Sequence, residues 1–146
     1  MAHEDEYTII QDVVGPGEPG DRHHLVDYQT QQLLSNLWTE YMAKCREAQG
    51  PSPVVQAMRS ANYLFDNEAF AGDELQRGIR MASRTNRGCT FDVALWHKAD
   101  GRMVQRGQIS TVFIEPGKGA VPIPEPWWAA AEAIEGRTIP VTERKP

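Results

Sequence analysis

The fold is decided by residues 28–48, which read YQTQQLLSNLWTEYMAKCREA. Apolar side chains recur in this stretch at intervals of three and four residues, the spacing that places them on one face of an α-helix. This stripe consists of Leu34, Leu37, Trp38, Tyr41, Met42 and Cys45. Asp27 is a candidate N-cap, and Gly50-Pro51 ends the pattern. We therefore predict one long helix whose apolar face must be buried against another element.

The segments on both sides of this helix have the alternation and the β-branched content of strands. The predicted strands are residues 7–14, 54–65, 74–83, 89–98 and 102–115. The last two are joined by Asp100-Gly101, a strong hairpin signal because this dipeptide tolerates the positive φ that a tight turn requires. A proline-rich segment over residues 116–126 leads to a short helix over residues 127–135. These elements predict an α+β fold in which an antiparallel sheet wraps around one long central helix.

Length and composition indicate a single folded domain. The chain has 146 residues, of which 40% are hydrophobic and 24% charged, as in ordinary globular domains. We expect this domain to cover residues 1–136 and residues 137–146 to form a flexible C-terminal tail. The net charge of −5 disfavours nucleic acid as a partner, because domains that bind it are usually basic.

The cysteines and the N-terminus indicate a cytoplasmic protein. Cys45 and Cys89 lie far apart in sequence and match no C-x-x-C spacing, which is typical of free thiols in a reducing compartment. The first six residues are acidic and are not followed by the apolar segment of a secretory signal. The apolar runs are far shorter than the ~20 residues that span a bilayer, so no membrane partner is expected.

Four short motifs give the chain a family resemblance. They are DRHHLVDY at residues 21–28, FAGDEL at 70–75, DGRMV at 100–104 and VPIP at 121–124. With these motifs, in this order and over nearly its whole length, the chain resembles the hotdog-fold thioesterases of the 4-hydroxybenzoyl-CoA thioesterase type. The resemblance implies a single hotdog domain that hydrolyses a thioester of coenzyme A or of an acyl carrier protein. It also implies a homodimer or homotetramer, and no cofactor besides the coenzyme A moiety of the substrate.

The first motif departs from the family pattern in the loop that carries the chemistry. His23 stands where the family usually has glycine, Val26-Asp27 replaces an asparagine pair, and the spacing from Asp21 to His24 is one residue shorter. The resemblance implies that a loop carboxylate acts as base or nucleophile while the N-terminus of the central helix polarises the thioester carbonyl. Asp21 is the closest match to this carboxylate. Asp27 is the alternative, because the one-residue deletion allows a second alignment with the family motif in which Asp27 takes the position of the carboxylate.

The neighbouring polar residues are candidates for supporting roles. His24 could orient the substrate or the catalytic loop, and the alternative is a solvated loop histidine. The pair His23-His24 has no further ligand at a useful spacing, so no metal site is predicted. The candidate substrate-binding residues are Tyr28 and Gln32 at the start of the helix, and Ser60 and Asn62 on one face of the second predicted strand.

The basic residues are concentrated in one part of the chain. Between Arg77 and Arg106 there are seven basic and two acidic residues, a net charge of +5 on an acidic protein. Arg84, Thr85 and Arg87 fall in this part, in a turn that in the resembled family lies near the phosphates of coenzyme A. Guanidinium groups suit phosphate well, so these three residues are the candidate coenzyme A site. A solvated, charged hairpin tip is the alternative.

Two other functions remain open at this point. A hotdog dehydratase or polyketide-pathway enzyme would use a histidine near a carboxylate to remove water from an acyl thioester. A non-catalytic acyl-CoA-binding protein would keep the fold, but its altered loop would no longer support turnover of the thioester. Comparing water loss, thiol release and simple binding on the same thioesters would separate the three.

Overall fold

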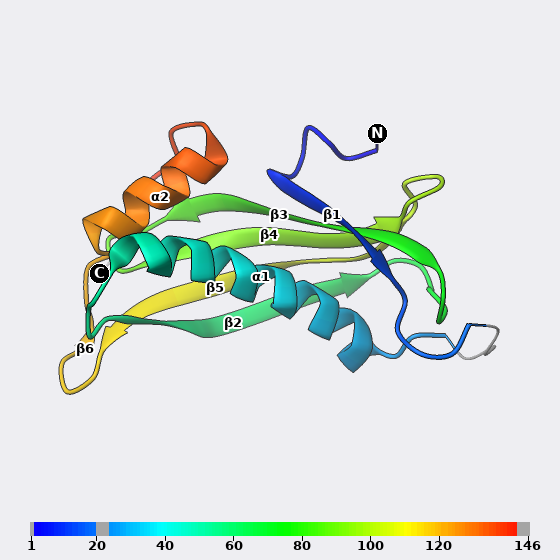
Figure 1. The fold of residues 1–146 in the computed structure, drawn as a ribbon, viewed down its shortest axis with the longest axis horizontal. Coiled ribbons are helices and arrows are strands. Elements are labelled where there is room, and N and C mark those ends of the chain that lie inside the picture. Colours follow the sequence, from blue (N-terminus) through cyan, green and yellow to red (C-terminus); the bar gives the residue numbers. More distant parts are fainter. Residues whose placement is uncertain (1, 20–23, 143–146) are drawn as a thin grey trace.

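The computed structural model describes residues 2–19 and 24–142. The chain forms a six-stranded antiparallel sheet and two helices (Figure 1). In chain order the elements are β1 (Ile9–Val14), α1 (Asp27–Gln49), β2 (Val55–Phe65), β3 (Glu74–Arg84), β4 (Gly88–His97), β5 (Met103–Glu115), β6 (Gly119–Ala120) and α2 (Glu125–Glu135). The strands lie in the order β1-β3-β4-β5-β2, with β6 paired to the end of β5. β1 and β2 are therefore the two edges of the sheet.

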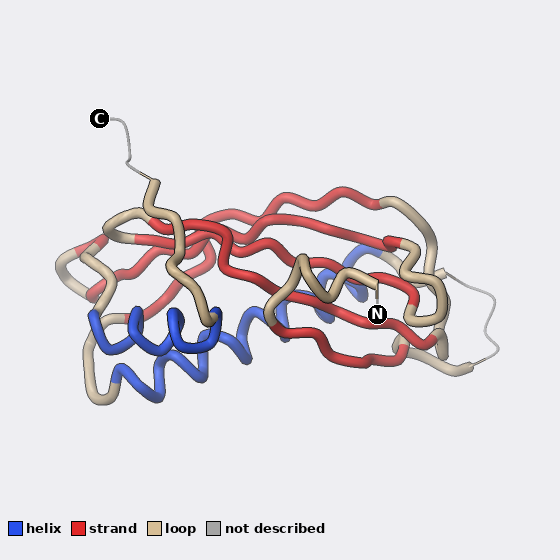
Figure 2. The backbone as a smooth tube through the Cα atoms, turned by 90° about the horizontal axis from the view of Figure 1, so that it is seen from above, coloured by secondary structure: helices blue, strands red, loops and turns tan. Residues whose placement is uncertain are grey.

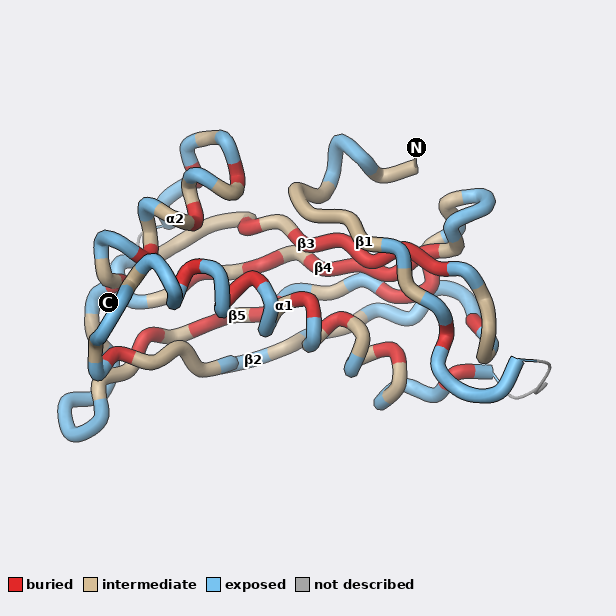
Figure 3. Tube along the Cα trace, viewed as in Figure 1, coloured by how far each residue is buried: buried red, intermediate tan, exposed pale blue. Residues whose placement is uncertain are grey.

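The helix α1 lies along one face of the sheet, which curves around it (Figures 1 and 2). Its stripe is buried: Leu34, Leu37 and Tyr41 are at most 1% exposed. They meet the alternate strand residues that face the helix, such as Phe91 and Ile109. Figure 3 shows this buried layer between the helix and the sheet, with exposed residues on the outer side of α1.

The N-cap prediction for Asp27 is wrong. The N-cap is Val26, which has an extended backbone, and Asp27 is already the first helical residue. Its carboxylate accepts a hydrogen bond from the adjacent Tyr28 N–H at 2.9 Å, which is not the capping bond that an N-cap side chain makes to a residue two or three positions further on. The Gln29 side chain instead accepts from the Val26 N–H at 3.0 Å.

Residues 137–142, which the sequence assigns to the flexible tail, lie against the sheet. The Arg84 N–H donates to the Pro140 carbonyl at 3.0 Å, and the Thr142 N–H donates to the Arg84 carbonyl at 2.7 Å. Close to these bonds, Ile139 is 2% exposed. This part of the chain is thus fixed beside the end of β3. Across residues 2–19 and 24–142, no helix is long and apolar enough to cross a membrane.

Candidate active site

A cavity of about 370 Å³ lies at the N-terminal end of α1. One wall is the chain that enters the helix, with His24, Leu25 and Val26, and the first helical turn, with Thr30. The opposite wall comes from the end of β2, the segment after it and the start of β5. These residues are Phe65, Asp66, Asn67, Glu68, Ala69 and Val104. The cavity therefore lies between the helix start and one end of the sheet.

Backbone hydrogen bonds hold the two walls together. The Leu25 N–H donates to the Ala69 carbonyl at 2.6 Å, and His24 pairs with Phe70 in an isolated antiparallel bridge. On the sheet side, the Asp66 N–H donates to the Val104 carbonyl at 2.9 Å. The loop that enters α1 is thus positioned by the segment that follows β2.

The helix start contributes partial positive charge on its side of this cavity. The first N–H groups of a helix have no acceptor inside the helix, and the helix dipole places partial positive charge there. At α1, one such group is engaged by a neighbouring carboxylate, since the Tyr28 N–H donates to Asp27. An oxygen that develops negative charge in this cavity would be stabilised by the same end of the helix.

The predicted catalytic residues are placed as follows. His24 lines the cavity and is exposed, and Asp27 lies in the first turn of α1, next to the cavity-lining Val26. Asp21 lies outside the described residues. The structure therefore brings His24 and Asp27 to the same end of the helix.

None of the predicted substrate-binding residues lines this cavity. Tyr28 is 70% exposed on α1, and the Gln32 side chain donates to Asn36 at 2.8 Å on the exposed side of the helix. Ser60 and Asn62 do share a face of β2, but it is the outer face of the sheet, because Ala61 and Tyr63 between and beside them pack against the core. Asn62 instead lines a separate cavity of about 630 Å³ on that outer face.

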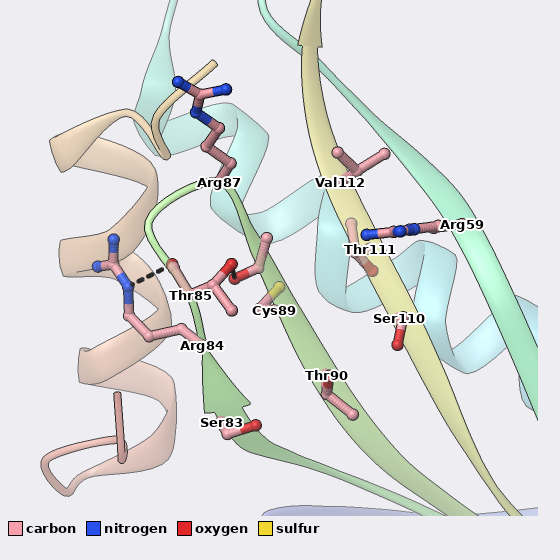
Figure 4. A pocket seen from close by; sticks show the side chains of 11 residues that line it. Arg59, Ser83, Arg84, Thr85, Arg87, Cys89, Thr90, Ser110, Thr111 and Val112 are labelled. Carbon is pink, nitrogen blue, oxygen red and sulfur yellow. Dashed lines mark hydrogen bonds between the residues drawn. The ribbon is translucent and has the colours of Figure 1, made fainter. Parts of the chain in front are cut away.

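A small basic cavity of about 120 Å³ lies at the turn between β3 and β4 (Figure 4). The predicted residues Arg84, Thr85 and Arg87 all line it. Its other lining residues are Arg59, Ser83, Gly88, Cys89, Thr90, Ser110, Thr111 and Val112. The cavity therefore combines three arginines with a floor of hydroxyl groups, a combination suited to phosphate.

Arg59 is the member of this set that sequence reasoning missed. The register between β2 and β5 shifts between Met58 and Ser60, so Arg59 is the additional residue of a β-bulge. A bulge changes the direction of the side chain at the additional residue. Alternation along the strand therefore does not predict where the Arg59 side chain lies. Arg59 is the only basic residue in β2, which is the one signal that could have drawn attention to it.

The three arginines of this cavity fan out. The Arg84 guanidinium lies 4.1 Å from the ring centre of Trp128 on α2, and its Nε donates to the Thr85 carbonyl at 3.1 Å. In Figure 4, the Arg84 side chain lies beside α2, Arg87 extends from the turn between β3 and β4, and Arg59 reaches from β2 across β5. Such a spread matches an extended polyanion with several phosphate groups better than a single small anion.

The chain segments that line the two cavities lie at opposite ends of α1: the β3–β4 turn is beside its C-terminal end, and the end of β2 is beside its N-terminal end (Figure 1). The arginine cavity is linked to the C-terminal end of α1. The Arg87 carbonyl accepts a hydrogen bond from the Phe113 N–H, and Phe113 pairs with Gln56 on β2. The Gln56 side chain donates to Gln49, the last residue of α1. The other cavity is lined by Val26, directly before the helix. Because α1 has 23 residues, it spans about 34 Å. One chain therefore keeps the helix-start cavity and the arginines far apart.

The cysteines are unsuited to nucleophilic chemistry. Both are free and buried, and burial raises the pKa of the Cys89 thiol well above its usual range, although Cys89 borders the basic cavity. In the part of the chain that the structure describes, no three His, Cys, Asp or Glu side chains gather closely enough to hold a metal ion.

The architecture is the hotdog fold, and several of the solved structures that share it are named thioesterases. A 1,4-dihydroxy-2-naphthoyl-CoA thioesterase from Synechocystis aligns over 84% of this chain and 93% of its own, with a TM-score of 0.71 and 16% identity. A thioesterase from Thermus thermophilus, solved with coenzyme A and Zn, covers 90% and 98%, with a TM-score of 0.68 and 17% identity. A hypothetical protein from Staphylococcus aureus, solved with CoA, covers 91% and 87%, with a TM-score of 0.73 and 12% identity.

At such identities the likeness establishes the fold of this chain and leaves its substrate to be argued from the site. No family model and no curated protein matches the sequence.

Proposed function

We propose that the protein is a thioester hydrolase that cleaves an acyl-CoA to the free acid and coenzyme A. The observation that carries this proposal is the cavity at the start of α1, on a fold shared with structures that are named thioesterases. A carboxylate, either Asp21 before the helix or Asp27 in the first turn of α1, would activate water or attack the thioester carbon. The positive end of the α1 dipole would stabilise the carbonyl oxygen as it becomes an oxyanion. His24 would orient the substrate from the cavity wall.

The arginine cavity would hold the coenzyme A phosphates. Its hydroxyl groups and the guanidinium groups of Arg59, Arg84 and Arg87 are suited to a polyanion. The stacking of Arg84 on Trp128 keeps that side chain extended at the rim, which lowers the entropy lost when a phosphate binds. An acyl carrier protein, whose prosthetic arm carries a single phosphate, would use fewer of these groups.

Because the two cavities lie at opposite ends of α1, we propose that each complete site is built from two chains. The edge strand β2 leaves eleven residues with one side open to pairing, which favours the addition of a second sheet. Large apolar side chains are also exposed around the helix-start cavity, where a second copy would cover them. They are Val26 and Phe65 in its lining, Tyr28 in the first turn of α1, and Phe70, which pairs with the lining residue His24.

The first test is a thiol-release assay on aliphatic and aromatic acyl-CoA thioesters. We expect hydrolysis by the unmodified protein and a loss of at least about 100-fold in kcat for Asp21→Asn, as for removal of a catalytic carboxylate. Loss in Asp27→Asn with full activity in Asp21→Asn would assign the role to Asp27. Asp5→Asn is the matched control, since it removes an exposed carboxylate beside the outer-face cavity. Full activity in both Asp21→Asn and Asp27→Asn would contradict the mechanism.

A further inference from the structure

Gln105 is a fully buried side chain whose amide is unpaired. It lies near the start of β5 and is 0% exposed. Among the described residues, neither its Nε2 nor its Oε1 atom has a hydrogen-bond partner. Burying an amide without partners is unfavourable, and such groups are rare in folded proteins. The position thus calls for an explanation.

A second glutamine on the same face of the sheet shows what a paired amide looks like. One row of paired residues runs across the sheet from Gln11 on β1 to Gln105 on β5. Arg77 on β3 and Leu95 on β4 lie between them in this row. Arg77 donates to the Gln11 side-chain oxygen from Nε at 3.0 Å and from Nη2 at 2.8 Å, and to the Leu33 carbonyl of α1 at 2.7 Å. These polar groups therefore serve to fasten α1 and β1 to β3. The Gln105 amide makes no such hydrogen bond between elements in the described part of the chain.

Gln105 lies directly behind the wall of the helix-start cavity. Its preceding residue, Val104, and its partner on β2, Phe65, both line that cavity. Residues directly opposite in antiparallel strands point to the same face, with Cβ atoms ~5 Å apart. Phe65 is 58% exposed, so more than half of its side-chain surface is open to solvent and the ring is not held in the core. An acyl group that enters past Phe65 would meet the Gln105 amide.

We infer that Gln105 determines which acyl group the cavity accepts, and that this group carries a hydroxyl. This inference rests on the proposed function and narrows its substrate class. A primary amide offers one strong acceptor and two donors, and a hydroxyl group can accept from it and donate to it at once. A plain hydrocarbon chain would leave both amide atoms unpaired in the complex, so the site would select against it.

The test compares acyl-CoAs with their hydroxylated counterparts, such as butyryl with 3-hydroxybutyryl and benzoyl with hydroxybenzoyl. We expect the unmodified protein to prefer at least one hydroxylated member by about tenfold or more in kcat/KM, the value of one hydrogen bond. Gln105→Leu should remove this preference. It should also raise the Tm by about 2–4 °C, because it removes an unpaired buried amide.

Two matched variants separate specificity from stability. Gln11→Leu makes the same substitution at the paired glutamine and should lower the Tm, because Arg77 loses its partner, with the hydroxyl preference kept. Trp127→Phe removes another buried donor that is unpaired among the described residues, on α2 at the far end of α1. It should leave the hydroxyl preference unchanged.

The inference is overturned if the unmodified protein shows no preference in any pair, or if Gln105→Leu keeps the preference. If no acyl-CoA is hydrolysed, the proposed function fails by itself. Gln105 is then judged by ligand-induced Tm shifts with the same pairs. A larger shift with the hydroxylated member, lost in Gln105→Leu, would support its role, and equal shifts would overturn it.

Discussion

At the scale of single residues, the Glu135 carboxylate is a buried charge with several polar partners. Its side chain is 0% exposed, and it accepts hydrogen bonds from the Tyr41 hydroxyl and the Thr8 hydroxyl, both at 2.8 Å. Arg137 lies 3.4 Å away and supplies a counter-charge. The carboxylate thus links α1, α2 and the segment before β1. A buried charge is tolerated only with such complete pairing.

We predict that Tyr41→Phe lowers the free energy of unfolding by about 1.5–3 kcal/mol, the range for a hydrogen bond to a charged group. Urea denaturation followed by fluorescence measures this change. Tyr28→Phe, at a largely exposed position on the same helix, should change stability by less than about 0.5 kcal/mol. Equal effects of the two substitutions would show that the Glu135 pairing contributes little.

The buried thiols predict a loss of stability at alkaline pH. Burial, with a smaller contribution from Glu135, raises the pKa of Cys45 to about 12, and burial also raises the pKa of Cys89. In the unfolded chain both thiols would ionise at about pH 8.5. The folded state therefore holds these protons more tightly, so the contribution of the two thiols to stability is constant below about pH 8.5 and falls as pH rises toward about 12.

Urea unfolding at a series of pH values measures this dependence. Replacing both cysteines by alanine should flatten the decline above about pH 9, whatever it does to stability at neutral pH. A thiol reagent should label the native protein far more slowly than the unfolded protein at about pH 8. Rapid native labelling would contradict the burial of the two thiols.

At the scale of elements, the N-terminal segment is fastened to the outer face of the sheet by aromatic stacking. The Tyr7 ring lies on Trp96 with centroids 5.5 Å apart, and His3 lies on the same indole at 4.8 Å. This close approach requires Gly78 beneath it. A Cβ atom at Gly78 would lie 2.7 Å from Tyr7 and 2.8 Å from Trp96.

We predict that Gly78→Ala destabilises the protein by about 1–3 kcal/mol, since the added methyl group forces the aromatic pair apart. Unfolding experiments should also show an altered tryptophan emission. In a double-mutant cycle, Tyr7→Ala should reduce the penalty of Gly78→Ala, because one of the two clashes disappears. Strict additivity of the two substitutions would refute the proposed contact.

The sequence predicts the helices and strands whose bounds are set by local residue patterns. The helix over residues 28–48 is α1 within one residue at each end, because its apolar stripe and the terminating Gly50 are encoded locally. The five main strands are likewise close to their predicted ranges. The bulge at Arg59 and the pairing of Pro140 with β3 escape prediction, because each depends on a neighbouring strand that is distant in sequence.

The candidate site was predictable in the same uneven way. Arg84, Thr85 and Arg87 come together because they are adjacent in one turn. Alternation showed that Ser60 and Asn62 share a face but not which one, since β2 is an edge strand that is half-exposed on both faces. Gln105 carried no signal, because a glutamine among strand residues gives no indication that it is buried and unpaired.

At the scale of the whole molecule, the central claim is that an acyl-CoA hydrolase site is assembled from two chains. The helix-start cavity and the arginine cavity are separated by the length of α1, so one substrate molecule would take its carboxylate from one chain and its arginines from another. A particle of at least twice the 16.4 kDa chain mass is therefore required in solution.

Subunit complementation tests this claim most directly. One inactive variant carries the catalytic substitution, Asp21→Asn or Asp27→Asn as the first assay decides, and the other carries Arg84→Ala with Arg87→Ala. They are mixed in equal amounts under conditions that exchange subunits, and thiol release is measured below the KM of the unmodified protein. We predict recovery of about a quarter of the unmodified activity, because half of the particles are mixed pairs and each has one intact site. Mixed particles that form, as shown by mass, but stay inactive would contradict a site shared between two chains.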